Sequence, residues 1–330
     1  MQSDGGHGMT RRETTGKEAA LMAMGLSVIA FPGTGNIVHF IGDEKGFYKA
    51  EGIEVALTPT PNSVFQITEF VKGTFDIAST AIDNIVAYTE GQGAAKLDRD
   101  PDMFVFMGGA QIELPFVVAP GIETYEDIKG KTLALDALST GFAFILYKML
   151  EKGGLKEGDF EFVSVGGTDK RWASLDAGEH AGALLNDPFT HFALAKGFRI
   201  MESNLDLFDH YQSGCFAARR SWAKENGDAL VAFIRAHVRI LDWLADPANA
   251  GEAATILAAK IPTLAPPAAK AAVAKLAAPR TGFTPKCALD REGIKTVLAL
   301  RSEYGKPQKK LDDPDAYLDL SYYEEALRTL

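Results

Sequence analysis

The sequence predicts an α/β protein made of two similar α/β units in tandem, followed by a helical C-terminal part. Short apolar segments bounded by glycine, proline or asparagine alternate with segments whose apolar residues have helical spacing. The alternation restarts once, after residue 126, and long helical segments follow Ser221. The 330 residues are 46% hydrophobic and 24% charged, which is ordinary globular composition and sufficient for two cores.

The first unit is predicted from glycine-bounded segments near the start of the chain. An apolar strand at 26–30 ends at Pro32-Gly33, and the turn PGTGN leads into a helix at 37–45. Gly46 is expected to end this helix, because glycine adopts the left-handed conformation of a helix C-terminus without strain. The remaining predicted elements are a strand at 53–57, a helix at 64–72 that ends at Gly73, and a strand at 75–78.

The second unit repeats the pattern, and helices follow it. Its strands are expected to be short and parallel like those of the first unit, so ligands should bind beyond their carboxyl ends. The predicted strands are 132–135, 160–165, 183–185 and 199–202, and the predicted helices are 142–152 and 171–175. The C-terminal helices are predicted at 222–244, 250–259, 266–277, 289–304 and 322–330.

Charge and residue spacing exclude several classes of function. The net charge is −10 and the pI is near 5.2, so we expect no nucleic-acid partner, which would need a basic face. The six histidines have no metal-ligand spacing, and GTGN lacks the third glycine of a dinucleotide fingerprint, so we expect neither a metal nor a cofactor. Cys215 and Cys287 allow one disulfide, and the sequence leaves open whether they pair.

The N-terminal segment permits two interpretations. Arg11-Arg12 followed by an apolar stretch at 19–31 has the charged-then-apolar order of a secretory signal. The apolar part is better explained as the first core strand, and no small-residue cleavage motif follows it. Either a native signal is missing from this chain, or the protein stays in the cytoplasm.

Four motifs, in this order and spacing, resemble one known family. They are GDEKGFYKAEGIEVAL, FVKGTFDIASTAID, YEDIKGKTLALD and WASLDAGEHAGALLNDPF. The chain from Leu26 onward is similar to the type II periplasmic binding proteins, the solute receptors of ABC importers for nitrate, sulfonates, taurine and thiamine-pyrimidine precursors. Two positions depart from the family pattern: Ala181 replaces an aspartate, and Asn186 stands in a step that is commonly Glu-Pro or Asp-Pro.

The resemblance implies two α/β lobes joined by two hinge strands, with a ligand clamped between them. On this pattern 1–25 is an N-terminal extension, 26–110 and 215–330 form lobe 1, and 111–214 form lobe 2. The implied function is a periplasmic, monomeric receptor that closes on a small anionic or heteroaromatic ligand, such as a sulfonate, a carboxylate or a pyrimidine-like molecule. It would deliver this ligand to ABC permease subunits in the membrane.

The candidate ligand-binding residues lie on the loops that leave the carboxyl ends of the strands. We select Ser139-Thr140-Gly141 as the seat for an anion, because hydroxyls and free backbone N–H groups at a helix N-terminus attract negative charge. The alternative is that these hydroxyls and amides only cap helices. The full set is Thr34, Gly35, Asn36, Asn62, Ser63, Ser79, Thr80 and Asp83 of lobe 1, Ser139, Thr140, Gly141, Asn186, Asp187 and Phe189 of lobe 2, and Gln111 and Gln212 on the hinge strands. The loop at 166–168 is also expected to reach the cleft.

Some candidates also have a purely structural explanation. Asp83 and Asp187 could bind a ligand amine or ring N–H, or could pair with the dipole of their own helix. Phe65, Phe142 and Phe189 could stack on a planar ligand, although single aromatic residues in loops more often pack against the core.

The alternative function is a cytoplasmic enzyme or ligand sensor on the same fold, acting on a small aromatic or sulfur-containing compound. Some relatives on this fold are catalysts, and Cys215 near His210 could in principle form a nucleophile and base. A cysteine among apolar neighbours on a hinge strand is better explained by packing. No pair of carboxylates stands out as acid and base either, so we expect a binding protein and no catalytic residues.

Overall fold

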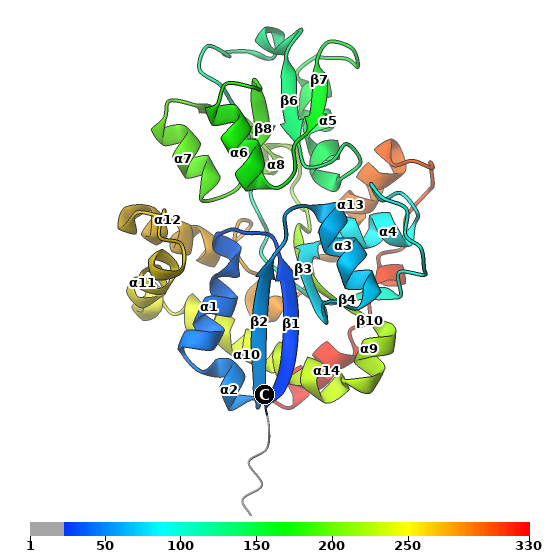
Figure 1. The fold of residues 1–330 in the computed structure, drawn as a ribbon, viewed down its shortest axis with the longest axis vertical. Helices are drawn as coiled ribbons and strands as arrows, with labels where there is room; N and C mark the ends of the chain where they lie inside the picture. The colour runs from blue at the N-terminus through cyan, green and yellow to red at the C-terminus, as the bar shows by residue number, and fades with distance from the viewer. Residues whose placement is uncertain (1–22) are drawn as a thin grey trace, which may run out of the picture.

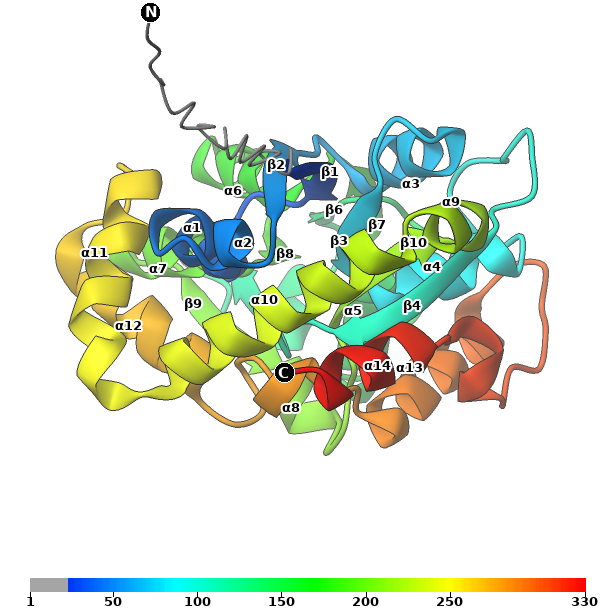
Figure 2. The same cartoon turned by 90° about the horizontal axis from the view of Figure 1, so that it is seen from below.

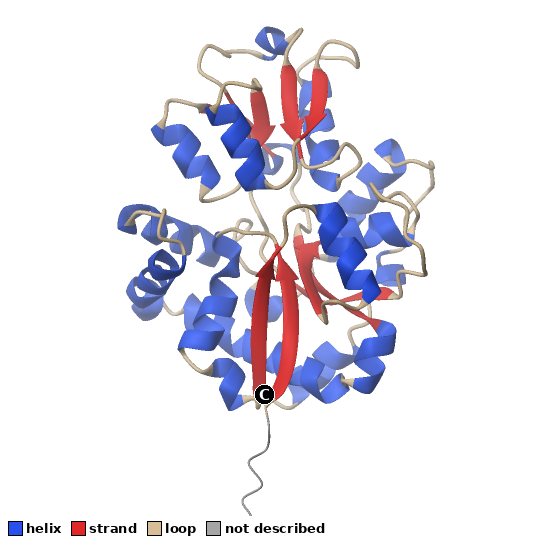
Figure 3. Cartoon of the chain, in the orientation of Figure 1, coloured by secondary structure: helices blue, strands red, loops and turns tan. Residues whose placement is uncertain are grey.

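The computed structural model describes residues 23–330 and contains two five-stranded sheets, one above the other in Figures 1 and 3. We call the first sheet with the helices packed on it lobe 1, and the second sheet with its helices lobe 2. Arg11, Arg12 and the start of the apolar N-terminal segment lie outside the described residues.

The sheet of lobe 1 is built from two distant parts of the chain. β1 pairs in parallel with β2 and β3, as expected for strands joined through helices. β10 inserts between β3 and β4 and is antiparallel to both, so the sheet is mixed and not purely parallel. The spatial order is β2 (Ile53–Pro59), β1 (Met24–Ala30), β3 (Ile77–Ala81), β10 (Gly214–Arg219) and β4 (Met103–Gly108).

The sheet of lobe 2 has the same mixed character. β6 pairs in parallel with β7 and β8, whereas β5 is antiparallel to β8 and β9. β5 directly follows the chain's passage out of lobe 1, and β9 precedes its return. The order is β7 (Glu161–Ser164), β6 (Thr132–Leu135), β8 (Gly182–Leu184), β5 (Pro115–Val118) and β9 (Arg199–Ser203).

Most of the predicted helices are present, with some changes at their ends. The predicted helix at 222–244 is two helices, because the chain breaks at Asn226 between α9 and α10. Gly46 and Gly73 follow α1 and α3 with φ angles of 72° and 93°, which confirms the two predicted glycine ends. The helices of lobe 1 are α1 (Ile37–Glu44), α2 (Phe47–Ala50), α3 (Ser63–Lys72), α4 (Ile82–Thr89), α9 (Arg220–Glu225), α10 (Gly227–Ala245), α11 (Ala250–Lys260), α12 (Pro266–Ala277), α13 (Arg291–Tyr304) and α14 (Ser321–Arg328).

Lobe 2 carries fewer helices. They are α5 (Gly141–Lys152), α6 (Thr168–Asp176), α7 (Phe189–Ala195) and α8 (Asn204–Leu207). In the two lobes together, single turns of 3-10 helix lie at Thr34–Asn36, Tyr125–Ile128, Pro247–Asn249, Pro285–Cys287 and Pro314–Tyr317. In Figure 2, α10 lies across the underside of lobe 1. None of the described helices combines the length and the apolar composition needed to cross a membrane.

One apolar core extends through both lobes on one side of the molecule. A single buried cluster contains Val105 of β4, Phe116 of β5, Leu133 of β6, Phe144 of α5 and Leu298 of α13. α13 packs against α4 of lobe 1 and against α5 of lobe 2 (Figure 1). The lobes are therefore joined by packing along α13 as well as by the two crossing segments, 109–114 between β4 and β5 and 208–213 between α8 and β10.

Candidate functional site

A cavity of about 150 Å³ lies between the two sheets. Loops at the carboxyl ends of β1, β3, β6 and β8 reach it, as predicted for an α/β architecture. The crossing segments and α12 complete its wall. Ten of the selected ligand-binding residues line it: Thr34, Gly35, Asn36, Ser79, Thr80, Asp83, Thr140, Gly141, Asn186 and Asp187.

The N-termini of α5 and α6 meet this wall, so backbone N–H groups and the positive ends of helix dipoles lie at the cavity. Thr140 caps α5 and accepts a hydrogen bond from Ala143 N at 3.3 Å. Thr168 begins α6 and is also part of the wall. Capping and ligand contact are therefore compatible roles for Thr140.

The predicted anion seat at the start of α5 already holds a carboxylate of the protein. Asp83 Oδ2 accepts from Gly141 N at 2.6 Å, and the guanidinium of Arg301 donates to both Asp83 oxygens at 2.6 and 2.7 Å. Arg301 also donates to the carbonyl of Ser139 at 2.6 Å. Asp83 and Arg301 are 2% and 0% exposed. This ion pair therefore joins lobe 1 to the first turn of α5, and the side chain of Ser139 does not line the cavity.

Arg171 is a cavity residue that the sequence did not reveal. It lies in the first turn of α6 and is 3% exposed. Its guanidinium donates to Leu184 O, Gly166 O and Thr168 Oγ1 at 2.9 to 3.1 Å. All three acceptors are neutral, and no salt bridge to Arg171 occurs among residues 23–330. Burial lowers the pKa of this guanidinium, while the nearby carboxylates of Asp136 and Asp169 act in the opposite direction.

Lys275 is the second unpredicted cation in the wall. It lies on α12, and its ammonium group binds Glu113 at 2.7 Å and Asp187 at 3.0 Å. Burial acts to lower the pKa of Lys275, but the carboxylates of Asp187 and Glu113 together raise it. Lys275 thus remains charged and links α12 of lobe 1 to the loop after β8.

Aromatic rings form the apolar part of the cavity. Phe31, Phe142, Phe216 and Phe283 line it, and Phe142 also packs against the apolar core shared by the two lobes. Phe65 is 40% exposed and does not line the cavity. Phe189 packs against Phe192, with ring centroids 6.1 Å apart, and is also absent from the wall.

The remaining selected residues lie beside the cavity and serve structural roles. Asn62 caps α3 by accepting from Phe65 N at 2.8 Å, and Ser63 N approaches Asp136 Oδ2 at 3.4 Å. Gln111 and Gln212 lie on opposite crossing segments and bind each other, with Nε2 of Gln111 2.9 Å from Oε1 of Gln212. This hydrogen bond joins the two crossing segments, and neither glutamine lines the cavity.

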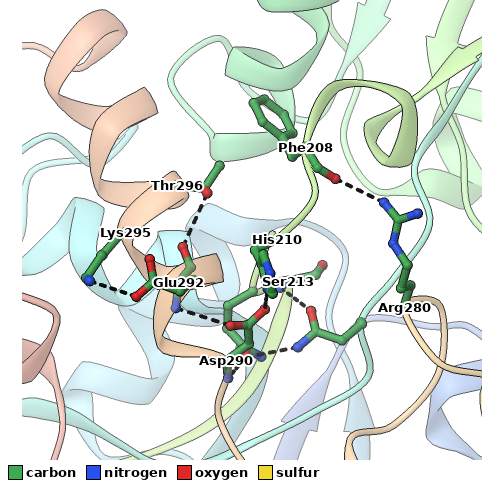
Figure 4. Close-up of polar contacts among 10 residues, drawn as sticks. Phe208, His210, Ser213, Arg280, Asp290, Glu292, Lys295 and Thr296 are labelled. Atoms are coloured by element: carbon green, nitrogen blue, oxygen red, sulfur yellow. Dashed lines mark hydrogen bonds and ion pairs between the residues drawn. The ribbon is translucent and has the colours of Figure 1, made fainter.

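The C-terminal segment reinforces this hinge, as Figure 4 shows. His210 binds the carboxylate of Asp290 at 2.9 Å, and Arg280 donates to Phe208 O at 3.2 Å. Ser213 lies between these contacts, and its backbone N–H donates to Gln111 Oε1 at 3.3 Å. The crossing segment at 208–213 is thus bound by Asp290 and Arg280 of the C-terminal part and by Gln111 of the other crossing segment.

The considered nucleophile and base do not form a pair. Cys215 is 1% exposed and burial raises the pKa of its thiol, which suppresses the reactive thiolate. His210 is bound to Asp290 on the surface. Cys215 and Cys287 are both free and buried, so they form no disulfide. No cluster of three or more His, Cys, Asp and Glu side chains suited to a metal occurs within 23–330.

Comparison with known proteins gives one family and a common fold. The model of the NMT1-like family matches residues 23–258. No curated protein sequence matches the chain.

Three solved structures illustrate the fold. The periplasmic nitrate-binding protein NrtA from Synechocystis PCC 6803 has a TM-score of 0.77 and 14% identity, over 93% of this chain and 89% of that one. The ligand-binding component of an ABC-type import system from Staphylococcus aureus, with zinc bound, has a TM-score of 0.74 and 13% identity, over 92% of this chain and 99% of that one. The alkanesulfonate-binding protein SsuA from Xanthomonas axonopodis pv. citri, bound to MOPS, has a TM-score of 0.67 and 16% identity, over 85% of this chain and 92% of that one. At these identities the likeness establishes the periplasmic binding protein fold.

Proposed function

The chain belongs to the NMT1-like family, and from this premise we propose that it is the solute-binding receptor of an ABC importer. The observation that carries the proposal is a cavity whose wall is contributed by both lobes and the hinge. Contacts also cross between the lobes at its edge: Thr34 N approaches Asp187 O at 3.4 Å, and Gly167 N approaches Pro61 O at 3.3 Å. A ligand that touches both lobes stabilises the closed form, which is how such a receptor signals occupancy.

The chemistry of the wall supports a small anionic or heteroaromatic solute, such as a sulfonate, a carboxylate or a pyrimidine-like molecule. The rings of Phe31, Phe142, Phe216 and Phe283 suit a planar or apolar body. Arg171, which forms no salt bridge among the described residues, and the N-terminus of α6 suit an acidic or electron-rich group.

The proposal includes the setting of the receptor. It would act as a periplasmic monomer and present its closed form to the permease subunits in the membrane. We place the lobe boundaries at 26–110 and 215–330 for lobe 1 and at 111–214 for lobe 2. No observation at the site favours the enzyme alternative, because Cys215 is buried, His210 is bound to Asp290, and Gln111 and Gln212 are bound to each other.

Ligand binding without turnover is the test of this function. Native mass spectrometry of gently purified protein, then thermal-shift and calorimetric titration with sulfonates, aromatic carboxylates, pyrimidines and nitrate, should identify a solute that binds one per chain. Binding should raise the melting temperature by mass action. Small-angle scattering should show a smaller radius of gyration with this solute. Chemical conversion of a screened compound would instead favour the enzyme.

A glycine variant checks that binding needs closure. A Cβ at Gly141 would lie 2.4 Å from Cγ of Asp83, which Arg301 holds in place, so Gly141→Ala should obstruct contact between the lobes. Overpacking of this kind costs roughly 1–3 kcal/mol, so the dissociation constant should rise about 5-fold to 150-fold. Gly251→Ala is the matched control, because Gly251 is exposed on α11 with open space around it. Unchanged affinity in Gly141→Ala would argue against clamping by the two lobes.

A further inference from the structure

We propose that the solute carries a hydrogen-bond donor that binds the carboxylate of Asp136, next to an acceptor group that binds the guanidinium of Arg171. The receptor would therefore select bipolar solutes and discriminate against bare anions. This inference rests on the proposed function and specifies the class of solute that the cavity accepts.

Asp136 is set apart from the other carboxylates of the cavity by its lack of a counter-ion. Among the described residues four carboxylates line the wall. Asp83 is paired with Arg301, and Glu113 and Asp187 are paired with Lys275. Asp136 forms no salt bridge; its Oδ2 accepts one long hydrogen bond of 3.4 Å, and its buried Oδ1 has no partner within 23–330. A buried carboxylate oxygen without a donor is costly, so a ligand donor is the natural partner.

Arg171 is the corresponding cation. The wall contains two basic residues among those described, and Lys275 is already bound by two carboxylates. The guanidinium of Arg171 has five N–H donors and makes three hydrogen bonds, so two donors remain for a ligand acceptor. Asp136 is close enough to raise the pKa of Arg171, yet no contact within 4.0 Å joins them. The two charges thus stand near each other, each with part of its hydrogen-bonding capacity unused.

Other atoms of the wall have the same unused capacity. Ser213 Oγ is in a residue that is 1% exposed, and Asn186 Oδ1 is also buried; neither has a partner among the described residues. Both residues line the cavity with Asp136 and Arg171. A hydroxyl can donate or accept, and an amide offers both functions, so these groups tolerate either end of a bipolar solute.

A bare anion would fit this arrangement poorly. It would satisfy Arg171 but would bring a second negative charge close to Asp136 in a cavity between the two lobes, where repulsion is stronger than in bulk solvent. It would also leave Asp136 Oδ1 without a donor. A protonated amine or amidine on the same solute removes both penalties, and a neutral amide N–H removes the second.

Two pairs of probes that differ chiefly in a donor group test the inference. Ethanesulfonate is compared with 2-aminoethanesulfonate, and benzoate with 3-(aminomethyl)benzoate, by calorimetric titration of the full chain. Within a pair that binds, the amino compound should bind at least about 10-fold more tightly, the scale of one charge-assisted hydrogen bond. In Asp136→Asn this preference should fall by a similar factor. The substitution preserves the shape of the side chain, and its thermal unfolding is measured alongside.

Asp169→Asn is the matched control. Asp169 also acts on the pKa of Arg171 but is exposed in the first turn of α6 and does not line the cavity, so the preference should persist in this variant. Equal or tighter binding of the bare anions, or an unchanged preference in Asp136→Asn, would overturn the inference while leaving the receptor function intact. Absence of binding by all four probes would also overturn it. The receptor function itself fails if the wider screen and the co-purified fraction are empty as well, or if a screened compound is converted.

Discussion

Asp83→Asn is expected to lower the free energy of unfolding by about 3–5 kcal/mol, the usual cost of removing one partner from a buried ion pair. The substitution leaves the guanidinium of Arg301, which is 0% exposed, without a counter-charge. It also weakens the hydrogen bond from Gly141 N, which connects the lobes. Urea denaturation at pH 7 measures the change in free energy directly.

Two controls separate loss of charge pairing from loss of packing. The double variant Asp83→Leu with Arg301→Met should lose less stability than Asp83→Asn, because it leaves no unpaired buried charge. Glu292→Gln removes a partner of Lys295 in an exposed pair and should change stability by less than about 1 kcal/mol. A loss below about 1 kcal/mol for Asp83→Asn would mean that this ion pair does not stabilise the structure.

Acidification from pH 7 to pH 5 is expected to destabilise lobe 1 through two buried histidines. Burial lowers the pKa of His237 to about 4, and burial together with the nearby His237 lowers the pKa of His39 well below its usual value. Each ring makes one hydrogen bond through Nδ1, His237 to Phe233 O and His39 with Tyr48 OH, both at 3.0 Å. Neither Nε2 has a partner among the described residues, so protonation there would bury an unpaired N–H.

The sign of the effect follows from proton linkage. Below about pH 6.5 the unfolded chain binds protons at these histidines and the folded chain does not, so stability falls as the pH drops toward the folded pKa. His237 alone should contribute a loss of about 3 kcal/mol by pH 4. The pKa of His210 is raised by its hydrogen bond to Asp290, and its contribution has the opposite sign.

Denaturant titrations at pH 7, 6 and 5 test this pH dependence. His237→Gln keeps a donor for Phe233 O but does not titrate, so its free energy of unfolding should depend less on pH than that of the unmodified protein. Most carboxylates titrate below this range, which limits their contribution. An equal pH dependence in both proteins would show that His237 is not responsible.

The fold was largely predictable because its signals are local. Gly46 and Gly73 end helices through their own backbone freedom, and the strand at 132–135 was found at its observed bounds. The break at Asn226 between α9 and α10 was missed, although the polar residues at 224–228 include Asn226-Gly227, a pair typical of a helix boundary. The antiparallel position of β10 was also missed, because it depends on pairing with β3 and β4 far away in the sequence.

The site was predictable in outline and not in its charges. Loops at the carboxyl ends of strands were correctly expected to meet, since parallel strands place those ends at one edge. The identity of the anion at the start of α5 could not be found, because Asp83 and Arg301 are 218 positions apart. The roles of Arg171 and Lys275 likewise depend on which partners the fold brings to them.

The packing of α13 determines where the molecule can open. Tyr304 of α13 contacts Phe144 and Tyr147 of α5, with ring centroids 5.6 and 5.7 Å apart, and we expect the lobes to stay in contact on this side when they open. The greatest displacement therefore falls on the opposite side, where Lys275 of α12 binds Asp187 beside a second, smaller cavity. We expect the cavity to open to solvent on this side, so that breaking the ion pair between Lys275 and Asp187 limits the rate of solute dissociation. The dissociation rate of the solute should then rise with ionic strength, because salt screens the ion pair. A rate that does not depend on salt would show that the solute leaves the cavity by another route.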